Sequence, residues 1–122
     1  MYEVTIEGGF SATHRLTYAD GSTEALHGHD WKVLVCLVGE GLDAEGMVAD
    51  FTVVQARLDE ITARLHHTHL NDHPWFDGLS PTAERVARTI CDRMSHDDVF
   101  GRSMCSVEVT ETPGCSARYV RS

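Results

Sequence analysis

An α+β fold, with a four-stranded antiparallel sheet and two helices packed on one face, is predicted by three features of the sequence. Apolar and polar residues alternate near both ends of the chain, which is typical of half-buried strands. Two segments in the middle carry apolar residues at helical spacing. The predicted order is therefore strand, strand, helix, helix, strand, strand, within a single domain that spans residues 1–122.

The first strand is expected to begin at Tyr2 and to continue beyond Gly8 and Gly9, because the alternation is found on both sides of these glycines. Two glycines inside a strand pattern predict a β-bulge. Residues 30–40 are rich in valine and leucine and form the expected partner strand. Residues 17–28 are then the loop that connects the two strands.

Two amphipathic helices are expected next. The first begins at Thr52, which forms with Gln55 the S/T-x-x-E/Q pattern of a capping box. The second follows Ser80, a typical N-cap residue, with Pro81 at its first position. Each helix has one apolar stripe, formed by Val54, Leu58, Ile61 and Leu65 in the first and by Ala83, Val86, Ala87, Ile90, Cys91 and Met94 in the second. These stripes are expected to pack on the sheet.

The chain is expected to close with a β-hairpin. Residues 104–112 and 116–122 flank Pro113 and Gly114, a pair that favours a turn. These two strands complete the four-stranded sheet. The exposed edges of such a sheet need protection, and oligomerisation is a common remedy.

The composition limits the partners that we expect. Nineteen acidic and ten basic side chains give a net charge of -9, which repels nucleic-acid phosphates and anionic lipids, so neither nucleic acid nor a membrane is expected. The N-terminus has no basic lead and no apolar run of about 18 residues occurs, so no signal peptide or membrane span is predicted. Four cysteines without a C-x-x-C pair, three of them in apolar runs, are typical of reduced core thiols. A cytoplasmic location is the expectation.

Three histidines are candidates for a metal site. His27 and His29 flank a single glycine, so they point the same way in an extended chain. His14 lies on the inward-facing alternation of the first strand, which a partner strand would bring close to them. Three imidazoles without a fourth protein ligand are the arrangement of a catalytic zinc. The spacing alone also allows an ordinary strand histidine beside an ordinary loop pair.

Six short segments occur in the order seen in one known family. They are FSATH at 10–14, LHGHD at 26–30, GMVADF at 46–51, HHTHLN at 66–71, PTAE at 81–84 and VTET at 109–112. Over nearly its whole length the chain resembles the family of 6-pyruvoyl-tetrahydropterin synthase and 6-carboxytetrahydropterin synthase. The resemblance implies the tunnelling fold, homohexamers formed as dimers of trimers, and zinc-dependent pterin sites between subunits.

The resemblance also implies roles for single residues. By position, His14, His27 and His29 would bind zinc, Glu111 would anchor the pterin, and Thr82 would be a second pterin contact. A carboxylate suits a pterin because it accepts hydrogen bonds from the amino and ring N–H groups. On local sequence alone, Glu111 is a solvated acid near a hairpin end and Thr82 is a residue of the first helical turn.

Two positions depart from the family pattern. Thr23 stands where the usual catalytic cysteine would be, and its hydroxyl is too weak an acid to replace a thiolate. One branch of the family carries E-x-x-H-G-H instead, which Glu24 matches, so Glu24 is the candidate proton acceptor. His67 matches the catalytic histidine of the family. Its usual aspartate partner is replaced by His66, so the ring loses the carboxylate that would orient it.

A second metal site is a further hypothesis for this segment. His66, His69 and His73 would share one face if the first helix ran through them. Asn71 and Pro74 favour termination of the helix, however. The preferred interpretation is that these histidines face solvent or substrate.

Three functions are consistent with these observations. The first is a zinc-dependent lyase that cleaves the side chain of 7,8-dihydroneopterin triphosphate by a retro-aldol reaction to 6-hydroxymethyl-7,8-dihydropterin, with Glu24 as base and His67 as proton donor to carbon. The second is a 6-pyruvoyl or 6-carboxy product, the latter in queuosine biosynthesis, against which the missing cysteine and aspartate argue. The third is a pterin-binding protein that has lost the synthase chemistry.

Overall fold

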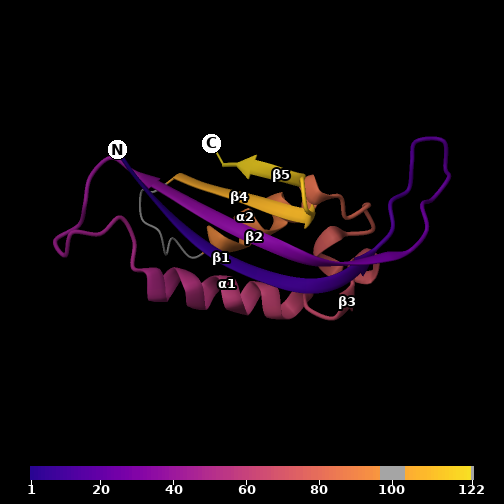
Figure 1. Cartoon of the computed structure of the whole chain (residues 1–122), viewed down its shortest axis with the longest axis horizontal. Coiled ribbons are helices and arrows are strands. Elements are labelled where there is room, and N and C mark those ends of the chain that lie inside the picture. Colours follow the sequence, from indigo (N-terminus) through magenta and orange to yellow (C-terminus); the bar gives the residue numbers. More distant parts are fainter. Residues whose placement is uncertain (97–103, 122) are drawn as a thin grey trace.

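The computed structural model describes residues 1–96 and 104–121, which form one sheet with two α-helices packed against it (Figure 1). The strands are β1 (Tyr2–His14), β2 (His27–Gly39), β3 (Thr68–His69), β4 (Met104–Thr112) and β5 (Cys115–Val120). The helices are α1 (Phe51–Leu65) and α2 (Ala83–Met94), with two short 3-10 helices, η1 (Leu70–Asp72) and η2 (Pro74–Phe76), between β3 and α2.

The sheet has the strand order β3-β1-β2-β4-β5. Four of these strands are antiparallel neighbours, as the sequence predicts. The prediction missed β3, which has two residues and pairs parallel to β1 at Ala12 and Thr13. A strand this short has no alternation that a sequence pattern can reveal. The sheet is therefore five-stranded and mixed.

The hairpin of β1 and β2 is regular along its full length. The two strands have 13 residues each and pair without a register shift, so the β-bulge expected at Gly8 and Gly9 is absent. A Cβ at Gly8 would meet the Leu58 side chain of α1 at 2.8 Å, and a Cβ at Gly9 would meet the carbonyl oxygen of Trp31 at 2.9 Å. Each glycine therefore permits a close approach. Strand β2 begins at His27, three residues earlier than expected.

Both helices begin at caps that the sequence analysis did not choose. Asp50 caps α1, because its carboxylate accepts the N–H of Thr52 at 2.9 Å. Thr82 caps α2 and accepts the N–H of Arg85 at 3.2 Å, so Ser80 is not the cap. A carboxylate at Asp50 also suits the positive end of the helix dipole.

Within the described residues, no helix is long and apolar enough to cross a membrane.

The two predicted apolar stripes form most of the helical side of the core. The stripe of α1 is buried throughout, and that of α2 is buried from Val86 to Met94. They cover one face of the sheet, which contributes Ile6, Phe10, Trp31, Val33, Val35, Leu37, Cys105, Val107 and Val109. At the end of the same face, His14 has no exposed surface. Because a buried imidazole is costly without partners, His14 marks the border between the core and a polar site.

The cysteines are all free thiols. Cys91 and Cys105 are buried between α2 and β4, with their sulfur atoms 3.6 Å apart, and Cys36 is half-buried. These three are the cysteines that the sequence places in the core, and the fourth, Cys115, is exposed. Burial raises the pKa of the Cys36 thiol. Cys91 and Cys105 therefore belong to the packed interior, as predicted, whereas Cys36 lies on the other face of β2 from the core residues Val35 and Leu37.

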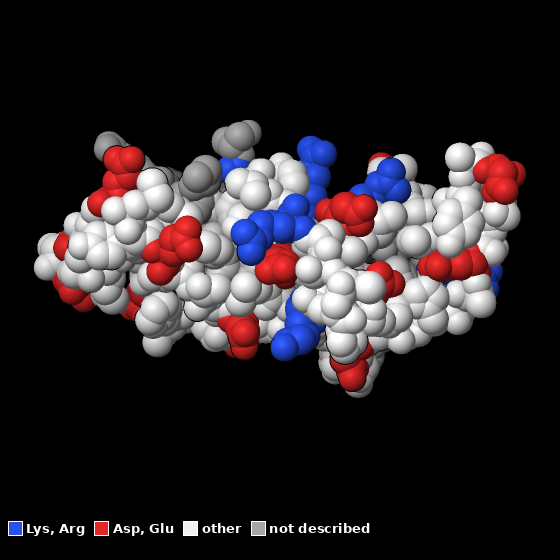
Figure 2. Space-filling model, turned by 45° about the horizontal axis from the view of Figure 1, so that its top comes forward, with Lys and Arg blue, Asp and Glu red and all other residues white. Residues whose placement is uncertain are grey.

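Acidic side chains dominate the charged surface, as the composition requires. Figure 2 shows carboxylates spread along the length of one face, with fewer basic groups among them. Some of these charges form pairs, such as Arg118 with Glu108 at 3.2 Å and Arg88 with Asp92 at 3.7 Å. Exposed pairs of this kind add little stability, so the fold depends mainly on its core.

Candidate metal centre

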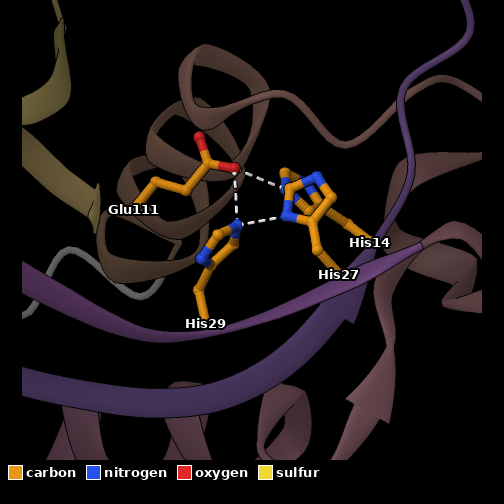
Figure 3. A group of neighbouring side chains, drawn as sticks. All are labelled: His14, His27, His29 and Glu111. Atoms are coloured by element: carbon orange, nitrogen blue, oxygen red, sulfur yellow. Dashed lines mark hydrogen bonds and ion pairs between the residues drawn. The ribbon is translucent and has the colours of Figure 1, made fainter. Parts of the chain in front are cut away.

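Four side chains converge where β1 ends and β2 begins (Figure 3). His14 is the last residue of β1 and pairs with His27, the first residue of β2, while His29 follows two positions along the same face. Glu111 comes from β4, one residue beyond the last pair between β2 and β4. One ligand atom from each residue lies within 4.8 Å of the others. We call His14, His27, His29 and Glu111 the histidine cluster.

The ring of His14 is oriented by two neighbours. It lies edge-on to Trp31, with 4.9 Å between the ring centroids, and its Nδ1 lies 2.9 Å from the carbonyl oxygen of Pro81. A carbonyl oxygen can only accept, so Nδ1 carries a proton and donates it. In the neutral ring the lone pair is then on Nε2, which faces the cluster.

Glu24 orients the ring of His27 in a similar way. Its Oε1 lies 2.7 Å from Nε2 of His27 and also accepts the N–H of Leu16 at 2.9 Å. The hydrogen bond to His27 is the main cause that lowers the pKa of the Glu24 carboxyl. Nε2 of His27 therefore donates to a carboxylate, and the lone pair of the neutral ring is on Nδ1, inside the cluster. Carboxylates behind metal-binding histidines fix the ring and raise its basicity.

His29 and Glu111 complete the cluster. Nε2 of His29 contacts Nδ1 of His27 and lies 3.1 Å from Oε1 of Glu111, which is 2.5 Å from Nε2 of His14. Burial is the main cause that lowers the pKa of His29, which favours the neutral ring that binds metals. With neutral rings, at most one proton, on Nε2 of His29, is available to these four inward-facing atoms. A divalent cation would satisfy all of them.

This set of donor atoms fits zinc. Zinc binds imidazole nitrogens at about 2.0–2.1 Å, and tetrahedral geometry then separates neighbouring ligand atoms by about 3.4 Å. Such a separation is within the 4.8 Å spread of the cluster. Calcium and magnesium prefer oxygen ligands, so three nitrogens argue against them. In residues 1–96 and 104–121, this is the one group of three or more histidine, cysteine or acidic side chains with such geometry.

His67, the expected catalytic histidine, is not part of the histidine cluster. Its backbone has a left-handed φ of 58°, its N–H donates to the carbonyl of Ser11 at 2.7 Å, and its ring stacks on His66 with 3.7 Å between centroids. A cavity of about 540 Å³ has both His67 and His29 in its wall. The other residues that line it are Ser11, Ala12, Thr13, Gly28, Asp30, Thr68 and His69. Within one chain, His67 and the candidate metal ligand His29 therefore line the same cavity.

The hypothesis of a second metal site is wrong for the described residues. Helix α1 ends one residue before His66, which confirms the predicted helix termination. His66 and His69 contact β1 through the N–H of Ser11 and the hydroxyl of Thr13, each at 3.0 Å. His73 instead lies 3.1 Å from a carbonyl oxygen in the last turn of α1. The three rings therefore have separate partners and do not converge.

Thr82, the second predicted pterin contact, acts as the cap of α2. Its hydroxyl oxygen accepts the N–H of Arg85, and its own O–H is left as a donor. It directly follows Pro81, the residue whose carbonyl holds His14. A role in pterin binding stays a prediction for Thr82.

Two contacts of the site were not predicted from the sequence. The place of Glu111 among the histidines depends on the pairing of β4 with β2, for which no local pattern gives a signal. The hydrogen bond from His27 to Glu24 had a weak signal, because Glu24 lies only three positions before His27, in the segment that leads into β2.

Comparisons with known proteins agree with this fold. The sequence profile of 6-pyruvoyl tetrahydropterin synthase matches residues 3–122. The chain is 36% identical to the 6-carboxy-5,6,7,8-tetrahydropterin synthase of Synechocystis, over 98% of this chain and 93% of the relative. It is 32% identical to the enzyme of the same name from Bacillus subtilis, over 92% of this chain and 80% of the relative. The chain therefore belongs to the 6-pyruvoyl tetrahydropterin synthase family.

Solved structures support the fold independently. The 6-pyruvoyl tetrahydropterin synthase of Plasmodium vivax matches with a TM-score of 0.84 at 21% sequence identity, and the match covers 98% of this chain and 97% of the other. At this low identity the likeness concerns the fold. The tunnelling fold that the sequence motifs imply is thereby confirmed.

Proposed function

We propose that this protein is a zinc-dependent enzyme that acts on the side chain of 7,8-dihydroneopterin triphosphate. The observation that carries the proposal is the convergence of three imidazoles, two of which have their outer nitrogens held by Pro81 and Glu24. Zinc at these nitrogens would supply a Lewis acid that polarises an oxygen of the substrate side chain. Membership of a family whose relatives are named as pterin synthases supports the choice of substrate class.

The first candidate product is the 6-carboxy pterin, which belongs to queuosine biosynthesis. Both relatives from Synechocystis and Bacillus subtilis are named 6-carboxy-5,6,7,8-tetrahydropterin synthase, and they match almost the whole chain. These names favour the 6-carboxy product over the retro-aldol reaction, which was the main expectation from the sequence.

The retro-aldol reaction is the second candidate, and the residues before the HGH motif favour it. Thr23 has no thiol, and Glu24 is the acid nearest to the histidines on that side. Oε1 of Glu24 is occupied by His27 and Leu16, so Oε2, which has the hydroxyl of Tyr18 at 3.5 Å, is the oxygen that would accept a substrate proton. In this scheme Glu24 both orients His27 and takes the proton of a side-chain hydroxyl.

The remaining residues would bind the substrate or return a proton. Glu111 would accept hydrogen bonds from the amino and ring N–H groups of the pterin, with Thr82 as a second contact. His67 would return a proton to carbon. Because His67 is not in the histidine cluster of its own chain, we expect a homohexamer, a dimer of trimers, to bring it to the cluster of another copy.

The test is metal content followed by identification of the product. Zinc-loaded protein is incubated with 7,8-dihydroneopterin triphosphate, and the product is identified by its mass. A 6-carboxy product supports the first candidate, and a 6-hydroxymethyl product supports the second. If zinc and pterins bind but the substrate persists, the protein is a pterin-binding member that has lost the synthase chemistry, and the proposal is rejected.

A further inference from the structure

Glu111 reaches the histidine cluster through a single carboxylate oxygen. This Oε1 lies 2.5 Å from Nε2 of His14 and 3.1 Å from Nε2 of His29 (Figure 3). The Glu111 side chain is 24% exposed, whereas His14 is fully buried. Its strand is irregular at this point, because the pairing of β4 with β5 shifts register between Thr110 and Thr112. The same carboxylate therefore contacts His14 and His29 and is also partly exposed to solvent.

When the His14 ring is neutral, hydrogen bonds alone do not account for this contact. Nδ1 of His14 donates to the carbonyl of Pro81, so Nε2 of the neutral ring is an acceptor that faces another acceptor, Oε1 of Glu111. Nδ1 of His27 is an acceptor as well, because Nε2 of the same ring donates to Glu24. These atoms point at one region, and one cation between them would satisfy all of them.

We propose that Glu111 is a fourth and exchangeable ligand of the zinc at the histidine cluster. The inference rests on the proposed function, because it takes zinc to bind at the three histidines. In the pterin-free protein, Oε1 of Glu111 completes a set of four protein ligands, which is the closed arrangement of structural zinc sites. A catalytic site requires an open position instead.

Pterin binding would convert the closed site into an open one. The amino and ring N–H groups of a pterin form strong hydrogen bonds with a carboxylate, and Glu111 is exposed enough to meet them. When the pterin takes this carboxylate, the metal loses its fourth protein ligand. The open position therefore exists only while a pterin is bound. Because pterin and zinc compete for Glu111, each weakens the binding of the other by the same factor.

The first experiment measures zinc affinity by competition with a chromophoric chelator. Glu111→Gln is expected to bind zinc about 10- to 100-fold more weakly than the wild type. Glu111→Asp keeps the charge but withdraws the carboxylate by one methylene, so it is expected to lose affinity as well. Glu108→Gln is the matched control from the same strand, because its carboxylate contacts Ser116 and Arg118 of β5. Its zinc affinity is expected to equal that of the wild type.

The second experiment uses cobalt(II) in place of zinc, because its visible absorption depends on coordination. Unsubstituted pterin is the probe, since it has the donor edge but no side-chain hydroxyl that could bind the metal. Saturating pterin is expected to change the spectrum of the wild type and of Glu108→Gln. The spectrum of Glu111→Gln is expected to differ from the wild type before pterin is added and to stay unchanged afterwards.

The outcomes separate this inference from the proposed function. If the wild type binds neither zinc nor cobalt, the proposed function fails and the inference fails with it. If the wild type binds both metals and Glu111→Gln matches it in zinc affinity and cobalt spectrum, only the inference is overturned. If Glu111→Asp retains full affinity while Glu111→Gln does not, negative charge near the metal is sufficient and direct ligation is rejected.

Discussion

The chain has two histidine-rich regions, the histidine cluster and the segment 66–69, and they differ in the partners of their rings. In the cluster, the outer nitrogens of His14 and His27 face acceptors, a carbonyl and a carboxylate, so the lone pairs point inward. In the segment, Nδ1 of His66 accepts the backbone N–H of Ser11, which uses its lone pair. The regions therefore differ in hydrogen-bond direction, at His14 and His27 compared with His66, and only the rings of the cluster converge among the described residues.

The largest effect is expected from His14→Ala. The wild type should bind about one zinc per chain, and the variant should bind almost none, because it loses a buried ligand at the centre of the cluster. Metal analysis of the purified proteins measures this, with circular dichroism as a check of the fold. His66→Ala is the control and should retain its zinc. Equal zinc content in wild type and His14→Ala would place the metal, if any, elsewhere.

Glu24 connects the cluster to the proposed chemistry. Glu24→Gln should lower turnover by about 10²- to 10⁴-fold, the share usual for a general base. It should retain zinc, because the amide oxygen can still accept the N–H of His27. Turnover of the triphosphate and zinc content are measured on the same samples. Thr23→Ala is the neighbouring control, and its turnover should change little. A large loss of turnover in Thr23→Ala, with none in Glu24→Gln, would assign the role of general base to Thr23.

Glu24→Ala isolates the orienting role of the same residue. Without any acceptor behind it, the ring of His27 is free to turn or to change tautomer. Zinc affinity should fall by about 10- to 100-fold, as for other residues that hold a metal-binding histidine. Chelator competition measures the change. Unchanged affinity in Glu24→Ala would show that the contact between Glu24 and His27 does not prepare the ring for a metal.

Pterin affinity tests the outer side of the cluster. Glu111→Gln should weaken the binding of neopterin by about 2–3 kcal/mol, or about 30- to 150-fold, because one charge-assisted acceptor becomes an amide. Calorimetric titration of the zinc-loaded protein measures it. Glu108→Gln should bind neopterin as the wild type does. Equal neopterin affinity in Glu111→Gln and wild type would show that Glu111 does not bind the pterin.

The smallest effect is expected in the other histidine-rich region. His66→Ala removes one hydrogen bond, between Nδ1 and the N–H of Ser11, at an exposed position where water can replace it. The free energy of unfolding should fall by about 0.5–1 kcal/mol. Denaturant unfolding measures the change, and zinc content should stay constant. A loss of zinc in this variant would contradict the distinction drawn between the two regions.

The sequence by itself determined both α-helices, strands β1, β2, β4 and β5, and most of the candidate ligands. Alternation in the strands and the apolar stripes of both helices depend on local periods, which are properties of the chain. The HGH motif places two imidazoles on one face of an extended segment for the same reason. Ordered motifs along the chain were sufficient to indicate the family, and the profile match over residues 3–122 confirms it.

Tertiary structure decided the features that depend on partners distant in the chain. Strand β3 exists because two residues meet the edge of β1, and Gly8 allows the close approach of α1. Glu111 joins the histidines because β4 pairs with β2 in one register, and a shift of one residue would turn its side chain to the other face. Only the packed sheet could determine that fourth member of the site.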